Sequence, residues 1–280
     1  MFLITGANGQ LGKCLQDILP AEQLLLTDAA ELDITDETAV LAFGNKHPVN
    51  AIINCAAYTN VDKAESEPEL AHKINAQGPA HLAKLAAAKN IPLIHISTDY
   101  IFDGTAHTPI LEDAPANPLG IYGKTKYEGE QAVLKYAPTA CILRTAWLYS
   151  QYGKNFVKTM LKLGAERSQL NVVTDQFGSP TYAPHLAQAI ADILPQIKPG
   201  TREIYHFTDE GTATWYDLAY YTIKCARLPC KVHPIHTNQY PTPAKRPAFS
   251  VLDKTKFKHT FNKSLPHWTK GVELCLKKLS

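Results

Sequence analysis

Short apolar runs alternate with amphipathic stretches along the first half of the chain. The apolar runs predict strands at residues 2–5, 24–27, 51–54, 91–96 and 141–144. Between them, apolar residues spaced three or four positions apart predict helices, among them those at residues 11–19, 82–86 and 122–126. Strands that alternate with helices at this rhythm indicate βαβ units. We therefore expect an α/β fold, with a Rossmann-type, doubly wound parallel sheet.

The regular alternation weakens beyond about residue 150. Apolar spacing still predicts helices at residues 155–161, 183–194, 215–226 and 268–279, and short strands at residues 171–173 and 203–207. Three prolines within residues 240–247 predict an irregular loop. We expect a nucleotide-binding Rossmann domain at residues 1–150, to which residues 170–195 return. Residues 151–280 would mainly form a smaller α/β substrate-binding domain over the strand ends.

Charge and composition narrow the class of protein. The 280 residues carry 28 Lys and Arg against 26 Asp and Glu, a balance without the basic excess of a nucleic-acid-binding surface. No apolar run is long enough to cross a bilayer, and the N-terminus enters a strand at once, without a signal-peptide pattern. Six scattered cysteines are typical of reduced thiols. These features predict a cytoplasmic protein without nucleic-acid or membrane partners.

A glycine-rich turn follows the first predicted strand. Gly6, Gly9 and Gly12 stand in the pattern Gly-x-x-Gly-x-x-Gly, directly before a helix. A strand, a glycine-rich turn and a helix together bring backbone N–H groups close to a pyrophosphate, so the turn predicts dinucleotide binding rather than an ordinary βα turn. Asp28 ends the second strand, where a carboxylate accepts hydrogen bonds from the adenosine ribose of NAD and repels the 2′-phosphate of NADP. It could equally be a turn residue.

Candidate acid–base chemistry lies further along. Tyr122 and Lys126 are four residues apart, so on a helix they share one face. A neighbouring ammonium favours the phenolate and is expected to lower the pKa of Tyr122. Ser97 and Thr98 end the fourth strand, where open α/β sheets bind ligands. Taken singly, the first pair could be a solvated helix face and the second a helix cap.

In this order, the three motifs resemble the extended short-chain dehydrogenase/reductase superfamily. Longer strings are similar to one of its families, the dTDP-4-dehydrorhamnose reductases. They are NCAAYTNVDKAE at residues 54–65, STDYIFDG at residues 97–104, RTAWLY at residues 144–149, NFVKTML at residues 155–161, DQFGSPT at residues 175–181 and Pro-x-x-Arg-Pro at residues 243–247.

The resemblance implies an oxidoreductase of dTDP-rhamnose biosynthesis, which transfers hydride from NADPH or NADH to the C4 ketone of dTDP-4-dehydro-β-L-rhamnose. It implies Tyr122 as proton donor, Lys126 as its partner on the nicotinamide ribose, and Thr98 as donor to the ketone oxygen. The cofactor-binding residues that it implies are Gly6, Gly9, Gln10, Leu11, Gly12, Asp28, Asp33, Ile34, Ala56, Ala57, Tyr58, Tyr122 and Lys126. The substrate-binding residues are Ser97, Thr98, Tyr100, Tyr122, Trp147, Asn155 and Arg246.

Alternatives remain open at this point. A related epimerase, dehydratase or 4-ketoreductase would use the same Tyr/Lys pair, although a dehydratase needs two acids near Thr98 and only Asp99 is present, followed by Tyr100. A non-catalytic regulatory subunit would not need the catalytic residues intact. Some members of the family dimerise through magnesium bound by glutamates, but Cys14 and Thr269 stand at those positions. We therefore expect no metal site, and a monomer or a metal-independent homodimer.

Overall fold

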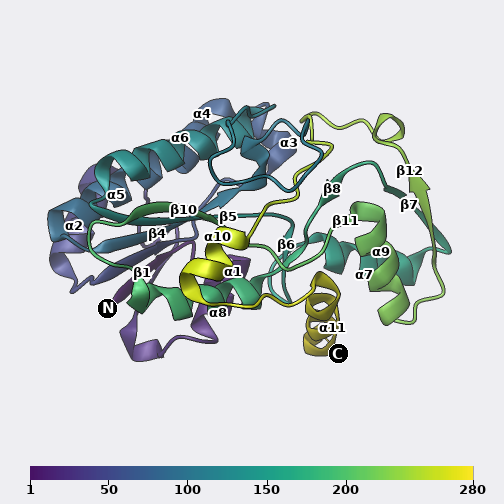
Figure 1. Ribbon diagram of the computed structural model, residues 1–280. Coiled ribbons are helices and arrows are strands. Elements are labelled where there is room, and N and C mark those ends of the chain that lie inside the picture. Colours follow the sequence, from purple (N-terminus) through teal and green to yellow (C-terminus); the bar gives the residue numbers. More distant parts are fainter. Residues whose placement is uncertain (280) are drawn as a thin grey trace.

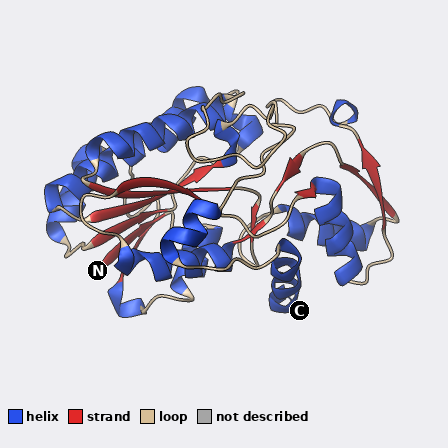
Figure 2. Cartoon of the chain, viewed as in Figure 1, coloured by secondary structure: helices blue, strands red, loops and turns tan. Residues whose placement is uncertain are grey.

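The computed structural model describes residues 1–279 and is built around a six-stranded parallel sheet between two layers of helices (Figures 1 and 2). Its strand order is β2-β1-β3-β4-β5-β10, so the direction of winding reverses between β1 and β3. The strands are β1 Phe2–Thr5, β2 Leu24–Thr27, β3 Ala51–Asn54, β4 Pro92–Thr98, β5 Thr139–Thr145 and β10 Arg202–His206.

Successive residues of each central strand face opposite helical layers, because side chains alternate across a strand. Leu3, Ile52 and Leu93 pack in the layer of α2 Glu37–Lys46, α5 Gly78–Lys89 and α6 Ile121–Tyr136. Their successors Ile4, Ile53 and Ile94 pack in the layer of α1 Gln10–Gln16, α8 Ala183–Ile193 and α10 Thr255–Phe261. The apolar runs of the sequence are therefore strands covered on both faces, as the doubly wound fold requires.

Between β3 and β4, a series of short helices leads into α5. These are α3 Val61–Ala64, α4 Pro68–His72 and a π-helical turn, Lys73–Gln77, which runs on into α5. The π turn carries Asn75, whose buried amide accepts a hydrogen bond from the backbone N–H of Tyr58 at 2.8 Å and donates one to its carbonyl at 3.1 Å. This amide holds the segment that leaves β3 against the helices.

A second group of elements lies beside the sheet, at the other end of the molecule from β1 (Figure 1). Its helices α7 Phe156–Glu166, α9 Trp215–Cys225 and α11 Trp268–Leu279 pack with the parallel pair β7 Gln169–Val173 and β12 Lys231–Ile235 in two small cores. Two-residue strands pair as β6 Leu148–Tyr149 with β9 Thr181–Tyr182, and β8 Phe177–Gly178 with β11 Ala213–Thr214. The 3-10 turns are η1 Ala21–Gln23, η3 Asp99–Ile101, η4 Leu194–Gln196 and η5 Thr237–Gln239.

The parallel doubly wound architecture is confirmed, and the first three strands have the predicted bounds. β4 and β5 extend further towards their C-terminal ends than predicted, to Thr98 and Thr145. α8, β10 and α10 come from the second half of the chain but lie with the main sheet. The division at about residue 150 remains a prediction.

No helix in the described part of the chain has the length and apolarity to cross a membrane. The six cysteines are all free thiols.

Candidate active site

A cavity of about 840 Å³ opens at the C-terminal ends of the strands, where the sheet order reverses. We call it the large cavity. It is lined by the glycine-rich turn after β1, the segments that leave β2, β3, β4 and β5, and one face of α6. Open α/β sheets bind their ligands at this edge, and the volume lies in the range of small-molecule sites. The fold thus brings the predicted motifs to one place.

The glycine-rich turn is shaped by close backbone contacts. Gly6 has a φ of +65°, and a Cβ there would lie 2.7 Å from the backbone nitrogen of Ala56. A Cβ on Gly12 would lie 2.5 Å from the carbonyl oxygen of Gly6. Only glycine fits either position, because real side chains do not tolerate such distances. The turn therefore lies flat against the end of β3, and Gly9 and Gln10 line the cavity above it.

The end of the large cavity beside β2 is acidic. The carboxylate of Asp28 accepts hydrogen bonds from the backbone N–H groups of Asn8 at 3.0 Å and Ala29 at 2.9 Å. Asp33 also lines this end and accepts from the backbone and hydroxyl of Thr35. The carboxylate of Asp28 is thus held by the glycine-rich turn itself, in the position that suits an adenosine ribose.

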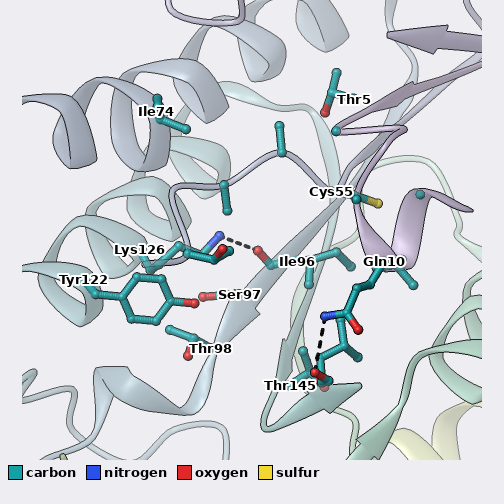
Figure 3. A pocket seen from close by; sticks show the side chains of 18 of the residues that line it. Thr5, Gln10, Cys55, Ile74, Ile96, Ser97, Thr98, Tyr122, Lys126 and Thr145 are labelled. Atoms are coloured by element: carbon teal, nitrogen blue, oxygen red, sulfur yellow. Dashed lines mark hydrogen bonds between the residues drawn. The ribbon is translucent and has the colours of Figure 1, made fainter. Parts of the chain in front are cut away.

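Tyr122 and Lys126 lie one turn apart on α6 and point towards the end of β4 (Figure 3). Gly123 makes this approach possible, because a Cβ there would lie 2.1 Å from the carbonyl oxygen of Tyr100. Lys126 is 2% exposed, and its ammonium donates a hydrogen bond of 2.6 Å to the carbonyl oxygen of Ile96. The ring of Tyr100 meets that of Tyr122 edge-on, with centroids 5.5 Å apart.

The prediction that Lys126 lowers the pKa of Tyr122 is wrong. Burial raises the pKa of Tyr122 to about 12, opposed by a hydrogen bond with Thr98. Burial also lowers the pKa of Lys126 to about 8, while the carboxylate of Glu130 favours its charged form. Desolvation is the largest cause of both shifts, and Lys126 directs its ammonium at the backbone carbonyl of Ile96. The phenol is consequently a proton donor near neutral pH, not a phenolate.

Three polar side chains gather where β4 ends. Ser97 and Thr98 are the last residues of the strand, and Asp99 begins η3. All three are buried and line the large cavity. The hydroxyl of Ser97 has no hydrogen-bond partner among residues 1–279. In Figure 3 the hydroxyl of Tyr122 points towards Ser97 and Thr98. A carbonyl oxygen placed here would meet two hydroxyls and a phenol, which is a proton-donating site.

Comparison with known proteins agrees with this geometry. A family model described as the RmlD substrate binding domain matches residues 1–280. The chain belongs to this family. It is 42% identical to a dTDP-4-dehydrorhamnose reductase of Aggregatibacter actinomycetemcomitans, over 97% of this chain and 96% of the relative. It is 38% identical to a dTDP-4-keto-6-deoxy-D-glucose reductase of Streptomyces niveus, over 97% and 94%.

Among solved structures, the chain resembles the Bacillus anthracis dTDP-4-dehydrorhamnose reductase in complex with NADP. The TM-score is 0.95, with 37% identity over 99% of this chain and 98% of that one. The Rossmann-type fold expected from the sequence is that of the RmlD family.

This RmlD-family chain has a second cavity, of about 680 Å³, between α7, β7 and the loop at residues 239–246. Trp215 lines both cavities, and its ring stacks on Trp147 with centroids 3.7 Å apart and planes 10° from parallel. Trp147 itself has a φ of +48° and lies against Gly178, where a Cβ would meet its ring at 2.7 Å. The stacked indoles form a wall between the two cavities.

Arg246 lines the second cavity and not the large one. Its guanidinium donates to both carboxylate oxygens of Asp62, at 3.1 and 2.8 Å. The loop of Arg246 is therefore tied to α3.

Two other predicted residues have unexpected roles. Tyr58 does not line the large cavity, and its hydroxyl donates to Glu67 at 2.6 Å. Asn155 lines the cavity but caps α7, accepting from the backbone of Lys158, while its amide N–H donates to Gln10 at 2.9 Å. Asn155 and Gln10 thus join the glycine-rich turn to α7.

Apart from Tyr58 and Arg246, every predicted site residue of this RmlD-family chain lines the large cavity. The predicted residues that line it are Gly6, Gly9, Gln10, Leu11, Gly12, Asp28, Asp33, Ile34, Ala56, Ala57, Ser97, Thr98, Tyr100, Tyr122, Lys126, Trp147 and Asn155. Lys154 and Trp215 also line it and had not been predicted. Lys154 adjoins the predicted Asn155, but Trp215 reaches the site only through tertiary packing.

Proposed function

We propose that this protein reduces the C4 ketone of dTDP-4-dehydro-β-L-rhamnose to dTDP-L-rhamnose, using NADPH or NADH. The observation that carries this proposal is the meeting of Thr98, Tyr122 and Lys126 in the cavity that also contains the glycine-rich turn. The likeness to named dTDP-4-dehydrorhamnose reductases over nearly the whole chain supports the choice of substrate.

The residues present fit a nicotinamide dinucleotide. The close contacts of Gly6 and Gly12 leave a backbone cradle that any Cβ would fill. Gly9, Gln10 and Leu11 would hold the pyrophosphate, Asp28 the adenosine ribose, and Asp33 with Ile34 the adenine. Ala56 and Ala57 provide a small-residue surface at the end of β3. When bound, the cofactor would supply the hydride that adds to C4.

Residues of this chain would bind the ketone oxygen and protonate it. Thr98, with Ser97 beside it, donates hydrogen bonds to the oxygen as negative charge develops on it. Tyr122 then transfers its proton to that oxygen. A phenol with a pKa raised to about 12 is almost fully protonated at neutral pH, as a proton donor must be. Lys126 would hold the nicotinamide ribose and would add positive charge to the site.

The second cavity would take the nucleotide part of the substrate. It shares the lining residue Trp215 with the large cavity, so a sugar in the large cavity would have its diphosphate near the wall of Trp147 and Trp215. Arg246 lies in this second cavity, and a guanidinium suits a diphosphate. Because Asp62 already holds Arg246, the substrate would compete with this carboxylate.

Three alternative functions can be distinguished from this proposal by experiment. Reduction of another dTDP-linked 4-keto sugar would use the same residues, and a relative named for such an activity is 38% identical to this chain. An epimerase would retain tightly bound NAD, and a regulatory subunit would bind a partner enzyme without turnover. We propose further that the protein acts in the cytoplasm, without nucleic acid, as a monomer or a metal-independent homodimer.

The test follows the absorbance of NADH or NADPH with purified protein and dTDP-4-dehydro-L-rhamnose generated in situ. Tyr122→Phe removes the proton donor and should lower kcat by at least about a hundredfold. Tyr136→Phe, on the exposed end of the same helix, is the matched control and should leave kcat unchanged. Dinucleotide binding without oxidation of either cofactor would contradict the reductase proposal and favour a regulatory subunit.

A further inference from the structure

Asp99 is a buried carboxylate next to the proposed catalytic threonine. Its side chain is 1% exposed, and it lines the large cavity. One carboxylate oxygen accepts a hydrogen bond of 3.2 Å from the hydroxyl of Thr98. The other oxygen has no hydrogen-bond partner among residues 1–279. A buried carboxylate is costly to keep ionised when one of its oxygens has no hydrogen-bond partner.

The carboxylate of Asp99 has no ion-pair partner in the described part of the chain. Within residues 1–279 no ion pair involves Asp99, since the nearby cations Lys126 and Arg246 are engaged by Ile96 and Asp62. The groups that face Asp99 are neutral: the phenol of Tyr100 on η3, the phenol of Tyr122 on α6, and the hydroxyl of Ser250.

The absence of a cation leaves the charge of Asp99 poorly compensated. Burial raises the pKa of Asp99 to about 6, although the hydroxyl groups of Ser250 and Thr98 lower it. At about pH 6 and below, a large fraction of the molecules therefore has a protonated, neutral Asp99.

Thr98 has only one hydroxyl proton to donate. Its oxygen already accepts a hydrogen bond from the backbone N–H of Tyr100, at 3.2 Å. If the proton is held by the carboxylate of Asp99, it is not available to a ketone oxygen in the cavity. The proton of Thr98 is thus contested between Asp99 and the substrate.

We propose that Asp99 is a positioning residue whose protonation state decides where the Thr98 hydroxyl donates. The inference rests on the reductase function proposed above. Ionised Asp99 accepts the proton of Thr98. Protonated Asp99, which takes its proton from solvent, donates to the oxygen of Thr98 instead, and the threonine proton turns to the ketone oxygen. No proton passes from Asp99 to the substrate, so the carboxyl group acts only through Thr98.

The charge of Asp99 acts in the same direction. Ionised Asp99 raises the pKa of Tyr122 and disfavours negative charge near the phenol. It therefore also disfavours the negative charge that develops on the ketone oxygen during reduction. Both effects make neutral Asp99 the productive form, and the rate should fall as the pH rises through the pKa of this group.

The first experiment measures kcat and KM with NADH from about pH 5 to about pH 8.5 for the wild type and Asp99→Asn. The kcat/KM of the wild type should fall at least about tenfold through a pKa near 6, because an electrophilic donor is lost. The amide of Asn donates permanently to Thr98, so the variant should lack this fall and equal or exceed the wild type at pH 8. The KM for NADH should be the same in Asp99→Asn and in the wild type.

Ser250→Ala provides a second variant outside the catalytic residues. It removes a hydroxyl group that lowers the pKa of Asp99, so the fall in rate should move to higher pH. If Asp99→Asn does not fold, this shift alone decides the outcome. The proposal would be overturned if the rates of both variants fell at the same pH as the rate of the wild type. So would a folded, NADH-binding Asp99→Asn that is inactive at every pH, because the ionised carboxylate would then be required.

Infrared difference spectra measure the protonation of Asp99 directly, without depending on turnover. The C=O band of a protonated carboxyl group should titrate near pH 6 in the wild type and be missing in Asp99→Asn. A wild type that shows this band but reduces no substrate contradicts the proposed function. An active wild type without a titrating band between pH 5 and pH 8 contradicts the role of Asp99.

Discussion

Replacing Arg144 by Met would leave the carboxylate of Glu130 buried without its cation. The two side chains are 3% and 0% exposed, and the guanidinium donates to both carboxylate oxygens, at 2.9 and 2.7 Å. Arg144 also donates to the carbonyl oxygen of Glu112 at 2.9 Å, so it ties α6, β5 and the loop before α6 together. Methionine can fill much of the space of the arginine stem, which confines the change mainly to charge and hydrogen bonds.

Removing one partner of a buried ion pair costs about 3–5 kcal/mol, because the remaining charge keeps its desolvation penalty. A chain of 280 residues has an unfolding entropy of about 0.6 kcal/mol per kelvin. The melting temperature of Arg144→Met should therefore fall by about 5–8 °C. The double variant Arg144→Met/Glu130→Met removes both charges, so it should be more stable than the single variant.

Urea unfolding followed by circular dichroism, with calorimetry, would measure both variants and Glu130→Met. Arg202→Met, at an exposed arginine of neighbouring β10, is the matched control and should cost less than about 0.5 kcal/mol. The prediction is refuted if Arg144→Met costs less than about 1 kcal/mol. It is also refuted if the double variant loses the sum of the two single losses, because the pair would then have no coupling energy.

Two further predictions concern charged groups of the large cavity. Asp28→Asn removes a carboxylate beside the proposed adenosine ribose, so the ratio of kcat/KM for NADPH to that for NADH should rise roughly tenfold; an unchanged ratio contradicts that placement. The pKa of Lys126 is lowered from 10.5 to about 8 in the folded protein. Between these two pH values the unfolded chain binds more protons than the folded protein, so the free energy of unfolding rises with pH. Lys126→Met should lack about 3 kcal/mol of this rise in the unfolding free energy, and equal pH slopes in the two proteins would contradict the lowered pKa.

The parts of the fold that sequence predicts well are those decided by local pattern. The strands at residues 2–5, 24–27 and 51–54 are apolar runs bounded by turn residues, and the structure reproduces their bounds. Parallel strands meet at one edge with their C-terminal ends, so the motifs that follow them had to lie close together. The large cavity confirms this for the glycine-rich turn, Ser97 and Thr98, and the Tyr122 helix.

What sequence could not predict depends on partners far along the chain. Arg246 is held by Asp62, 184 residues away, and Trp215 reaches the site from a helix outside the main sheet. Nothing local in the sequence signals either contact. The pKa of Tyr122 depends on burial, so the spacing to Lys126 suggested a lowered value where desolvation raises it.

The position of α6 connects the stability of the fold with its proposed chemistry. Gly123 sets the depth of the helix against Tyr100 near its start, and Glu130 anchors it to β5 through Arg144 two turns later. Lys126 lies between these two fixed points. Its ammonium is therefore held at the carbonyl of Ile96, and the charge of Glu130 keeps its pKa from falling further. The buried ion pair thus has a second effect, because the carboxylate of Glu130 favours the charged form of a buried lysine.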